Sequence, residues 1–311
     1  MDSSSFFEKL ERILIPEKDA VPIPGSSASF HEVAQPSLET HGSPLEPEKA
    51  PAIDVLIITA KTVEAEMLEE VLPGVRGEWY LSGLMCRRYF VKMSTGDSVA
   101  AMLITQPNMG LTSAAITATK AIQVLKPRLV IMVGICAGVE DTASIGDVVI
   151  ARFVLDYGSG KLTENDFYPN YHPIQTDPGL VSLFESLARK RDVLSRISKS
   201  FGNRGNKPRR KLRVVCGPMG SGQAVVTDSK LVQSILKHQR DLRAIDMEAY
   251  GIAHAALEAP RGPVPAIVVK GVSDLCIGKN DDYQKYAAYV SAAFAVEFLR
   301  TCYRRWIADH G

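Results

Sequence analysis

Three carboxylates that could do chemistry, Glu64, Glu248 and Asp274, each lie at the end of an apolar, strand-like run. Two carboxylates that exchange protons across a substrate, with a third that grips a diol, are suited to cleaving a ribosyl bond. In an open α/β sheet, ligands bind outside the carboxyl ends of the strands, where such positions gather. Each residue also has an ordinary explanation: Glu64 as a solvated helix residue, Glu248 as a first-turn residue favoured by the helix dipole, and Asp274 as a turn cap.

Glycine-containing turns follow several of the apolar runs. Gly110 precedes a helix rich in small residues, and Gly134 and Gly138 follow a very apolar strand. Such turns either present backbone N–H groups to a ligand oxygen or simply close a tight strand-to-helix connection. A third turn, over residues 217–228, has glycines that would allow the backbone to approach a flat ring. Three such turns together with three carboxylates suggest a pocket.

The elements that must position these residues alternate between strand and helix patterns from residue 53 onward, as in an α/β fold. We expect strands over 53–59, 84–93, 98–105, 129–134, 147–155, 212–216 and 264–272. We expect helices over 62–72, 111–126, 178–199, 228–239, 248–258 and 283–307. Residues 156–177 are predicted to be a long loop, of the kind that often forms a lid, and 202–211 a short basic loop.

The first fifty residues differ from the rest, so we divide the chain into an N-terminal segment over 1–51 and a catalytic domain over 52–311. Residues 16–51 contain seven prolines without sustained periodicity, which is typical of a solvated linker. Ahead of this linker, apolar residues recur at helical spacing between Phe6 and Leu14. An amphipathic helix there would either pack on the core or make residues 1–15 a docking peptide for a protein partner.

Composition limits the classes of function. The formal net charge of the 311 residues is +1, which gives no general attraction to nucleic acid or to an anionic membrane, although local basic clusters stay open. No window reaches the ~18 uncharged apolar residues of a membrane span. The five cysteines are dispersed, and His172, His238 and His254 lack metal-ligand spacing. We therefore expect a cytoplasmic protein with reduced thiols, no metal, and neither nucleic acid nor membrane as a partner.

The order of the motifs resembles that of the nucleoside phosphorylase and nucleosidase superfamily, specifically its methylthioadenosine/S-adenosylhomocysteine nucleosidase-like branch. The matching segments within residues 53–303 are ITAKTVEAE, NMGLTSAA, VGICAGV, GDVVI, SGQAVV, DMEAYGIAH and GVSD. The resemblance implies a three-layer αβα sandwich around a mixed, partly closed sheet. It also implies a homo-oligomer, either a dimer or a trimer of dimers. The expected chemistry requires no metal or organic cofactor. Residues 278–299 further resemble nucleosidase domains of immune and phage-defence effectors.

The resemblance assigns a role to each carboxylate. Asp274, in a pair with Ser273, aligns with the general acid that protonates N7 of the purine, and Glu64 with the carboxylate that orients and deprotonates the attacking water. Glu248 matches the residue that binds the ribose 2′ and 3′ hydroxyls, and Met247 is expected to pack against the sugar.

The same alignment identifies the base-binding turn. Ala224, Val225 and Val226 match the turn that binds adenine, with Val225 in place of the usual stacking aromatic ring. Because that ring is missing, the resemblance implies weaker stacking on the base.

The nucleophile is expected to be water. Phosphorolysis needs a cationic clamp for phosphate, and hexameric phosphorylases of this fold carry an arginine two residues before the glycine that aligns with Gly134. This chain has Met132 there. Ile135 also replaces the family's serine after this glycine, so one contact near the nucleophile differs.

Two lysines bear on the substrate. The position of Lys61 is usually apolar in alkylthio-nucleosidases and lies near the 5′ substituent, and Lys279 follows the predicted acid. These lysines either bind an anionic 5′ group or are ordinary solvated side chains. We therefore expect hydrolysis of the N-ribosidic bond of an adenine nucleoside or nucleotide, such as AMP or ATP, in an enzyme that could deplete nucleotides as an immune effector. The alternatives are a phosphate-dependent purine nucleoside phosphorylase and a nucleoside-binding sensor with weak catalysis.

Overall fold

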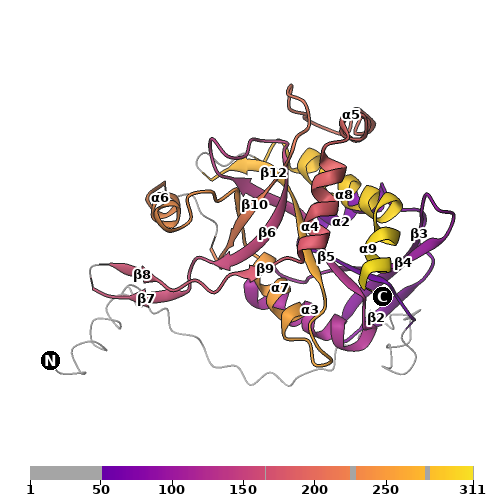
Figure 1. Cartoon of the computed structure of the whole chain (residues 1–311), viewed down its shortest axis with the longest axis horizontal. Helices are drawn as coiled ribbons and strands as arrows, with labels where there is room; N and C mark the ends of the chain where they lie inside the picture. Colours follow the sequence, from indigo (N-terminus) through magenta and orange to yellow (C-terminus); the bar gives the residue numbers. More distant parts are fainter. Residues whose placement is uncertain (1–50, 165, 225–228, 277–280, 311) are drawn as a thin grey trace, which may run out of the picture. The chain divides into compact units, whose positions relative to one another are not determined.

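The computed structural model describes residues 51–164, 166–224, 229–276 and 281–310 (Figure 1). Several predictions fall outside these residues: the helix and linker within 1–50, the base-binding Val225 and Val226, and Lys279. The division of the chain at residues 51 and 52 therefore stays a prediction.

A mixed sheet of ten strands is the centre of the described fold, in the order β11-β10-β6-β12-β5-β1-β4-β3-β2, with β9 paired to β6. The strands of this sheet are β1 (Val55–Thr59), β2 (Glu78–Leu81), β3 (Leu84–Lys92), β4 (Ser98–Thr105), β5 (Leu129–Gly138), β6 (Val148–Asp156), β9 (Ile174–Gln175), β10 (Val214–Ser221), β11 (Ala244–Asp246) and β12 (Ala266–Leu275). β1 is parallel to both β4 and β5, whereas β3 is antiparallel to β4.

One part of the sheet closes on itself. β11 pairs with β10 and also, antiparallel, with β5, where Ala244 lies opposite Gly138 and Ile245 opposite Ala137. The strands β11, β10, β6, β12 and β5 therefore form a ring, while the remaining strands extend from it as an open sheet. This closure brings the segment after β11 beside the carboxyl end of β5, although Gly138 and Asp246 are 108 positions apart in sequence.

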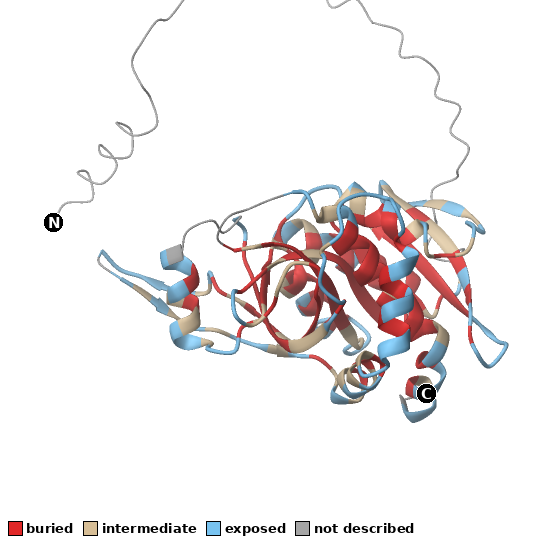
Figure 2. Cartoon of the chain, turned by 90° about the horizontal axis from the view of Figure 1, so that it is seen from above, coloured by how far each residue is buried: buried red, intermediate tan, exposed pale blue. Residues whose placement is uncertain are grey.

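Helices cover both faces of the sheet (Figures 1 and 2). The helices are α2 (Thr62–Glu69), α3 (Leu111–Leu125), α4 (Pro178–Ala188), α5 (Arg191–Ser200), α6 (Ser229–His238), α7 (Ala249–Leu257), α8 (Gln284–Thr301) and α9 (Tyr303–His310). Val55 and Ile57 of β1 pack in a core with α2, α4, α5 and α8, whereas Leu56 and Ile58 pack in a second core with α3 and α7. The alternation along this strand confirms the predicted three-layer αβα sandwich with a mixed, partly closed sheet.

Burial on both faces explains why the central strands are continuous apolar runs in the sequence. Every residue of β1 is buried, and α8, which packs against β5 and β12, buries thirteen of its eighteen residues. Phe184 of α4 stacks on Phe298 of α8 with ring centroids 4.2 Å apart. Aromatic pairs of this kind stabilise the fold by about 0.5–1.5 kcal/mol beyond the contribution of the apolar area that they bury.

Two predicted helices are each divided in the structure. The helix predicted over 178–199 consists of α4 and α5, because Lys190 has a non-helical backbone (ψ 90°). This break lets Val193, Leu194 and Ile197 of α5 turn to the core. The helix predicted over 283–307 likewise divides at Cys302 into α8 and α9.

The predicted strands over 129–134, 212–216 and 264–272 are too short. β5, β10 and β12 continue to Gly138, Ser221 and Leu275, through the glycines and small residues that the sequence analysis assigned to turns. The segment over 156–177 is also not a plain loop, because it contains the hairpin of β7 (Gly160–Leu162) and β8 (Phe167–Pro169) and then β9.

Candidate active site

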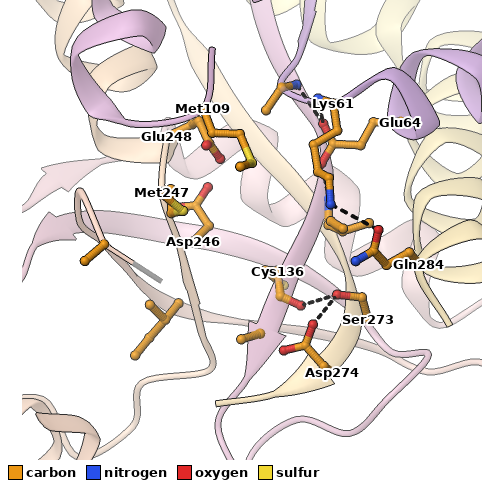
Figure 3. A pocket seen from close by; sticks show the side chains of 15 residues that line it. Lys61, Glu64, Met109, Cys136, Asp246, Met247, Glu248, Ser273, Asp274 and Gln284 are labelled. Carbon is orange, nitrogen blue, oxygen red and sulfur yellow. Dashed lines mark hydrogen bonds between the residues drawn. The ribbon is translucent and has the colours of Figure 1, made fainter. Parts of the chain in front are cut away.

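A cavity opens where β1, β5, β11 and β12 end, and it contains most of the predicted residues (Figure 3). It is lined by Ala60, Lys61, Glu64, Met109, Ile135, Cys136, Ala137, Ala224, Ile245, Asp246, Met247, Glu248, Ser273, Asp274 and Gln284. The three carboxylates come from the first turn of α2, the start of α7 and the end of β12. The fold therefore joins residues that are more than two hundred positions apart in sequence.

Glu64 is almost fully buried and held by backbone donors. Its Oε2 accepts hydrogen bonds from the N–H groups of Ala60 (2.6 Å) and Lys61 (3.0 Å), and its Oε1 accepts one from Ile135 (2.8 Å). The interpretation of Glu64 as a solvated helix residue is therefore wrong, since only 1% of it is exposed. Three donors fix the direction in which this carboxylate faces the cavity.

Gly134 makes room for Glu64. A Cβ at this position would lie 2.4 Å from Glu64 Oε1, so any larger residue would displace the carboxylate. Gly134 does not itself line the cavity, and its carbonyl accepts a hydrogen bond from Ser291. The structure therefore gives Gly134 a steric role behind the Glu64 side chain, and the expectation that its backbone N–H faces a ligand stays a prediction.

Gly110 has a comparable supporting role. Its N–H donates to Glu248 Oε1 (3.0 Å), and its φ of 107° lies in a region that favours glycine. Because this N–H is used inside the protein, the expectation that Gly110 offers it to a ligand oxygen is wrong. The glycine instead fixes the orientation of Glu248, which precedes α7 and is 5% exposed.

A buried lysine that the sequence analysis missed sits behind this carboxylate. Lys270 of β12 is fully buried, with its Nζ 3.2 Å from Asp246 Oδ2 and 3.6 Å from Glu248 Oε2. Burial by itself would lower the pKa of Lys270, but the charges of Asp246, Glu64 and Glu248 outweigh it and raise that pKa. The signal was available in AIVVKGVSDL, where a single cation interrupts an apolar strand.

Asp246 links this lysine to the backbone. Its carboxylate accepts hydrogen bonds from the Ser221 hydroxyl (2.6 Å) and from the N–H of Ala249 (3.0 Å), so it also orders the first turn of α7. Burial raises the pKa of Glu248, and the nearby ammonium of Lys270 opposes that effect. The Lys270 ammonium therefore favours the charged form of the Glu248 carboxylate, which is mostly shielded from solvent.

Asp274 lies apart from Glu64 and Glu248 in Figure 3. The Ser273 hydroxyl donates to Asp274 Oδ2 (2.8 Å) and also lies 3.3 Å from the carbonyl oxygen of Cys136. The register of β12 against β5 shifts between Val272 and Asp274. In a regular strand, neighbouring side chains such as those of Ser273 and Asp274 point to opposite faces of the sheet. An irregularity of this kind redirects a side chain, which explains how both residues line the cavity.

Lys61 and Gln284 close one side of the cavity. Lys61 Nζ donates to Gln284 Oε1 over 3.0 Å, between the β1–α2 turn and the first residue of α8. Among the described residues, Lys61 has no carboxylate within ion-pair distance. This half-buried ammonium therefore has a neutral partner that an anionic ligand group could replace.

The remaining lining is largely neutral. Burial raises the pKa of Cys136 well above its ordinary value, so this thiol stays protonated. No arginine is among the residues described at the cavity.

The described part of the chain contains no cluster of histidine, cysteine and carboxylate side chains suited to a metal ion. None of the described helices is long and apolar enough to span a membrane.

The predicted site is therefore largely brought together. Seven of the predicted residues line the cavity, namely Lys61, Glu64, Ala224, Met247, Glu248, Ser273 and Asp274. Gly110 and Gly134 support the carboxylates from behind, and Val225, Val226 and Lys279 lie outside the described residues. The lining residues Met109, Asp246 and Gln284 were not foreseen, and only the acidic Asp246, beside the Met-Glu pair, carried a signal in the sequence.

The sequence is similar to those of several known proteins. The chain is 28% identical over 207 residues to a death domain-containing ATP nucleosidase of Amphimedon queenslandica, which covers 61% of this chain and 36% of that protein. It is 25% identical over 249 residues to the 5′-methylthioadenosine/S-adenosylhomocysteine nucleosidase of Listeria monocytogenes, covering 79% of this chain and 98% of that enzyme. Among the first curated relatives that it matches, the chain spans about half of their length or less (49%, 36% and 51%).

Comparison with solved structures finds the same fold in a nucleosidase. The 5′-methylthioadenosine/S-adenosylhomocysteine nucleosidase of Neisseria meningitidis, solved with methylthio-immucillin-A, superposes with a TM-score of 0.60 at 22% identity. The match covers 79% of this chain and 98% of that structure, which shows a shared fold. The family model described as the phosphorylase superfamily matches residues 54–303. Because that match spans well over half of the sequence, this chain belongs to the phosphorylase superfamily.

Proposed function

We propose that this chain is an N-glycosyl hydrolase that releases adenine from an adenine nucleotide. The observation that carries the proposal is the placement of Glu64, Glu248 and Asp274 around one cavity, with each carboxylate positioned by hydrogen bonds from named neighbours. Relatives named as ATP nucleosidase and as methylthioadenosine/S-adenosylhomocysteine nucleosidase support the reaction class.

The proposed mechanism divides the proton transfers between two carboxylic groups. Asp274 donates a proton to N7 of the purine, and the electrons of the C1′–N9 bond move into the ring as adenine departs. Positive charge develops on the ribosyl ring, and a water molecule forms the new C1′–O bond while Glu64 accepts its proton. Glu248 binds the ribose 2′ and 3′ hydroxyls, with Met247 against the sugar. One proton leaves Asp274 and one reaches Glu64, so the enzyme is restored by exchange with solvent.

Water is favoured as the nucleophile over phosphate. A phosphorylase needs cations placed to bind phosphate, and the described lining has Lys61 as its cation and no arginine. Met132, where the related phosphorylases carry arginine, is fully buried and faces the core with α3 and α7. This position therefore cannot supply a clamp.

A nucleotide is favoured over a thioether nucleoside because of Lys61. A cation held by the neutral Gln284 amide would be an obstacle to an apolar 5′ thioether but could bind a 5′ phosphate. Charge-assisted hydrogen bonds of this kind contribute about 1.5–3 kcal/mol. If ATP is the substrate, the reaction would deplete the cell's nucleotides, so we further propose a role as a controlled effector, in line with the resemblance to defence nucleosidases.

Base release tests the proposal. We would incubate the full chain with AMP, ATP, adenosine and methylthioadenosine, each with and without phosphate, and quantify adenine by chromatography. We expect phosphate-independent release from AMP or ATP, and loss of release in Asp274→Asn. Ribose 1-phosphate formed only with phosphate would instead identify a phosphorylase. Tight nucleoside binding without release would identify a sensor. Light scattering of the same sample would test the proposed homo-oligomer.

A further inference from the structure

A groove outside the candidate active site concentrates positive charge. It lies between the end of α4, α5, and the segment from Lys207 to the start of β10. Eight of its fifteen lining residues are cationic: Arg189, Arg191, Lys199, Lys207, Arg209, Arg210, Lys211 and Arg213. None of the fifteen is acidic. We call this surface the basic groove.

The fold itself neutralises little of this charge. Arg210 and Arg213 share the buried Asp147, at 3.5 Å and 2.7 Å, and Lys207 donates to the carbonyl oxygen of Ser198. The other five cations of the basic groove have no carboxylate within ion-pair distance among the described residues, and all five are exposed. Since the whole chain has a net charge of only +1, this clustering is a local arrangement and not a consequence of composition.

The cluster is also electrostatically unfavourable for the protein alone. Like charges held on one surface repel one another, and a concave surface strengthens the field that they produce. Arg191 and the N-cap Lys190 stand at the start of α5, where the helix dipole contributes positive potential, no side chain caps the helix, and Asp192 is the acidic residue of the first turn. A bound polyanion would relieve both effects.

The chemistry of the lining favours phosphate groups as that polyanion. Five of the eight cations are arginines, whose planar guanidinium groups bind phosphate oxygens in pairs. No aromatic side chain lines the basic groove, so it has nothing on which a base could stack. A sequence-independent contact with a nucleic acid backbone fits these features.

A protein partner fits less well. Stable protein interfaces have an apolar centre, but the larger apolar side chains of the basic groove, Leu194 and Leu212, are buried. The exposed large hydrophobic residues of the described chain, including Met109, Ile116, Leu162 and Tyr168, all lie elsewhere. We therefore propose that the basic groove binds the phosphate backbone of a nucleic acid. The earlier expectation of no nucleic acid partner rested on net charge, which does not reveal clustering.

Binding to defined probes tests this proposal. We would measure fluorescence polarisation of labelled duplex DNA, single-stranded RNA and poly-glutamate with the full chain over a range of salt concentrations. The groove variant combines Arg189→Ser, Arg191→Ser, Arg209→Ser and Lys211→Ser. The control variant, with the same change in charge on exposed residues outside the basic groove, combines Arg76→Ser, Lys92→Ser, Lys120→Ser and Arg240→Ser.

We expect nucleic acid binding to weaken by at least about tenfold in the groove variant, with a shallower salt dependence, and to change much less in the control. Both variants should keep cooperative thermal unfolding. This measurement checks that they fold, and it does not depend on enzymatic activity. Equal losses in both variants would overturn the proposal, because they would reflect net charge alone. Absence of nucleic acid binding, or tighter groove-dependent binding of poly-glutamate, would overturn it as well.

Discussion

The protein interior behind the cavity and the basic groove hold cations in opposite ways. Behind the cavity, the fully buried Lys270 lies between Asp246 and Glu248, so its charge is matched within ion-pair range. In the basic groove, exposed cations gather with few carboxylates. Burial explains the difference, since an unmatched charge costs several kcal/mol in the interior but little at the surface. A buried cation therefore points to its internal partners, whereas an exposed cluster points to a ligand or partner outside.

Lys270→Met gives the largest expected effect on stability. Removing this ammonium leaves Asp246 and Glu248 buried without their counter-charge, which should lower the free energy of unfolding by about 3–5 kcal/mol. Urea denaturation would measure the loss. Lys211→Met, which removes an exposed cation of the basic groove, should stay within about 0.5 kcal/mol of the original. Similar values for the two variants would contradict the contrast drawn between the two regions.

Gly134→Ala tests whether the cavity depends on the position of Glu64. The new Cβ would overlap Glu64 Oε1, at 2.4 Å, and push the carboxylate from its three backbone donors. We expect kcat for base release to fall by about 10²-fold, a loss that misplacing a catalytic group by about 1 Å can cause. Gly74→Ala is the matched control, since a Cβ there meets nothing within 4 Å. An unchanged kcat in Gly134→Ala would show that Glu64 is not the base.

Lys61→Met tests a cation that we expect to bind substrate, in contrast to Lys270, which we expect to stabilise the fold. Because Lys61 pairs with the neutral Gln284, its loss should barely affect stability but should reduce kcat/KM for AMP or ATP about 10- to 100-fold. The rate for methylthioadenosine should be unchanged or higher. Equal losses on charged and uncharged substrates would show that this lysine does not recognise a 5′ anion.

The pH dependence of stability gives the smallest expected effect. Burial raises the pKa of Glu248 in the folded state, so the folded chain holds this proton more tightly than the unfolded chain does. That contribution is present below the unfolded pKa and is lost as pH rises through the folded pKa. Compared with Glu248→Gln, the original chain should therefore lose more stability over this interval. Parallel stability curves from urea denaturation between pH 4 and pH 7 would contradict the direction of the shift.

Much of the fold was predictable because its causes are local. The apolar runs of β1, β4 and β5 and the small residues of α3 predict elements that are buried on both sides or closely packed. Short or interrupted elements were not predictable in this way. β11 has three residues, and its place depends on pairing with β5 and β10, while the break at Lys190 depends on how α5 packs on the core.

By itself, the sequence determined the α/β alternation, the resemblance that implied a three-layer sandwich, the choice of Glu64, Glu248 and Asp274, and the basic character of the loop over 202–211. Only the tertiary structure decided that Glu64 is buried, that Gly110 and Gly134 support carboxylates, and that Lys270 balances Asp246 and Glu248. It also brought Arg189 and Arg191 beside the basic loop. The physical reason is that residue type and spacing fix local preference, whereas burial, charge pairing and clustering depend on contacts between segments distant in the chain.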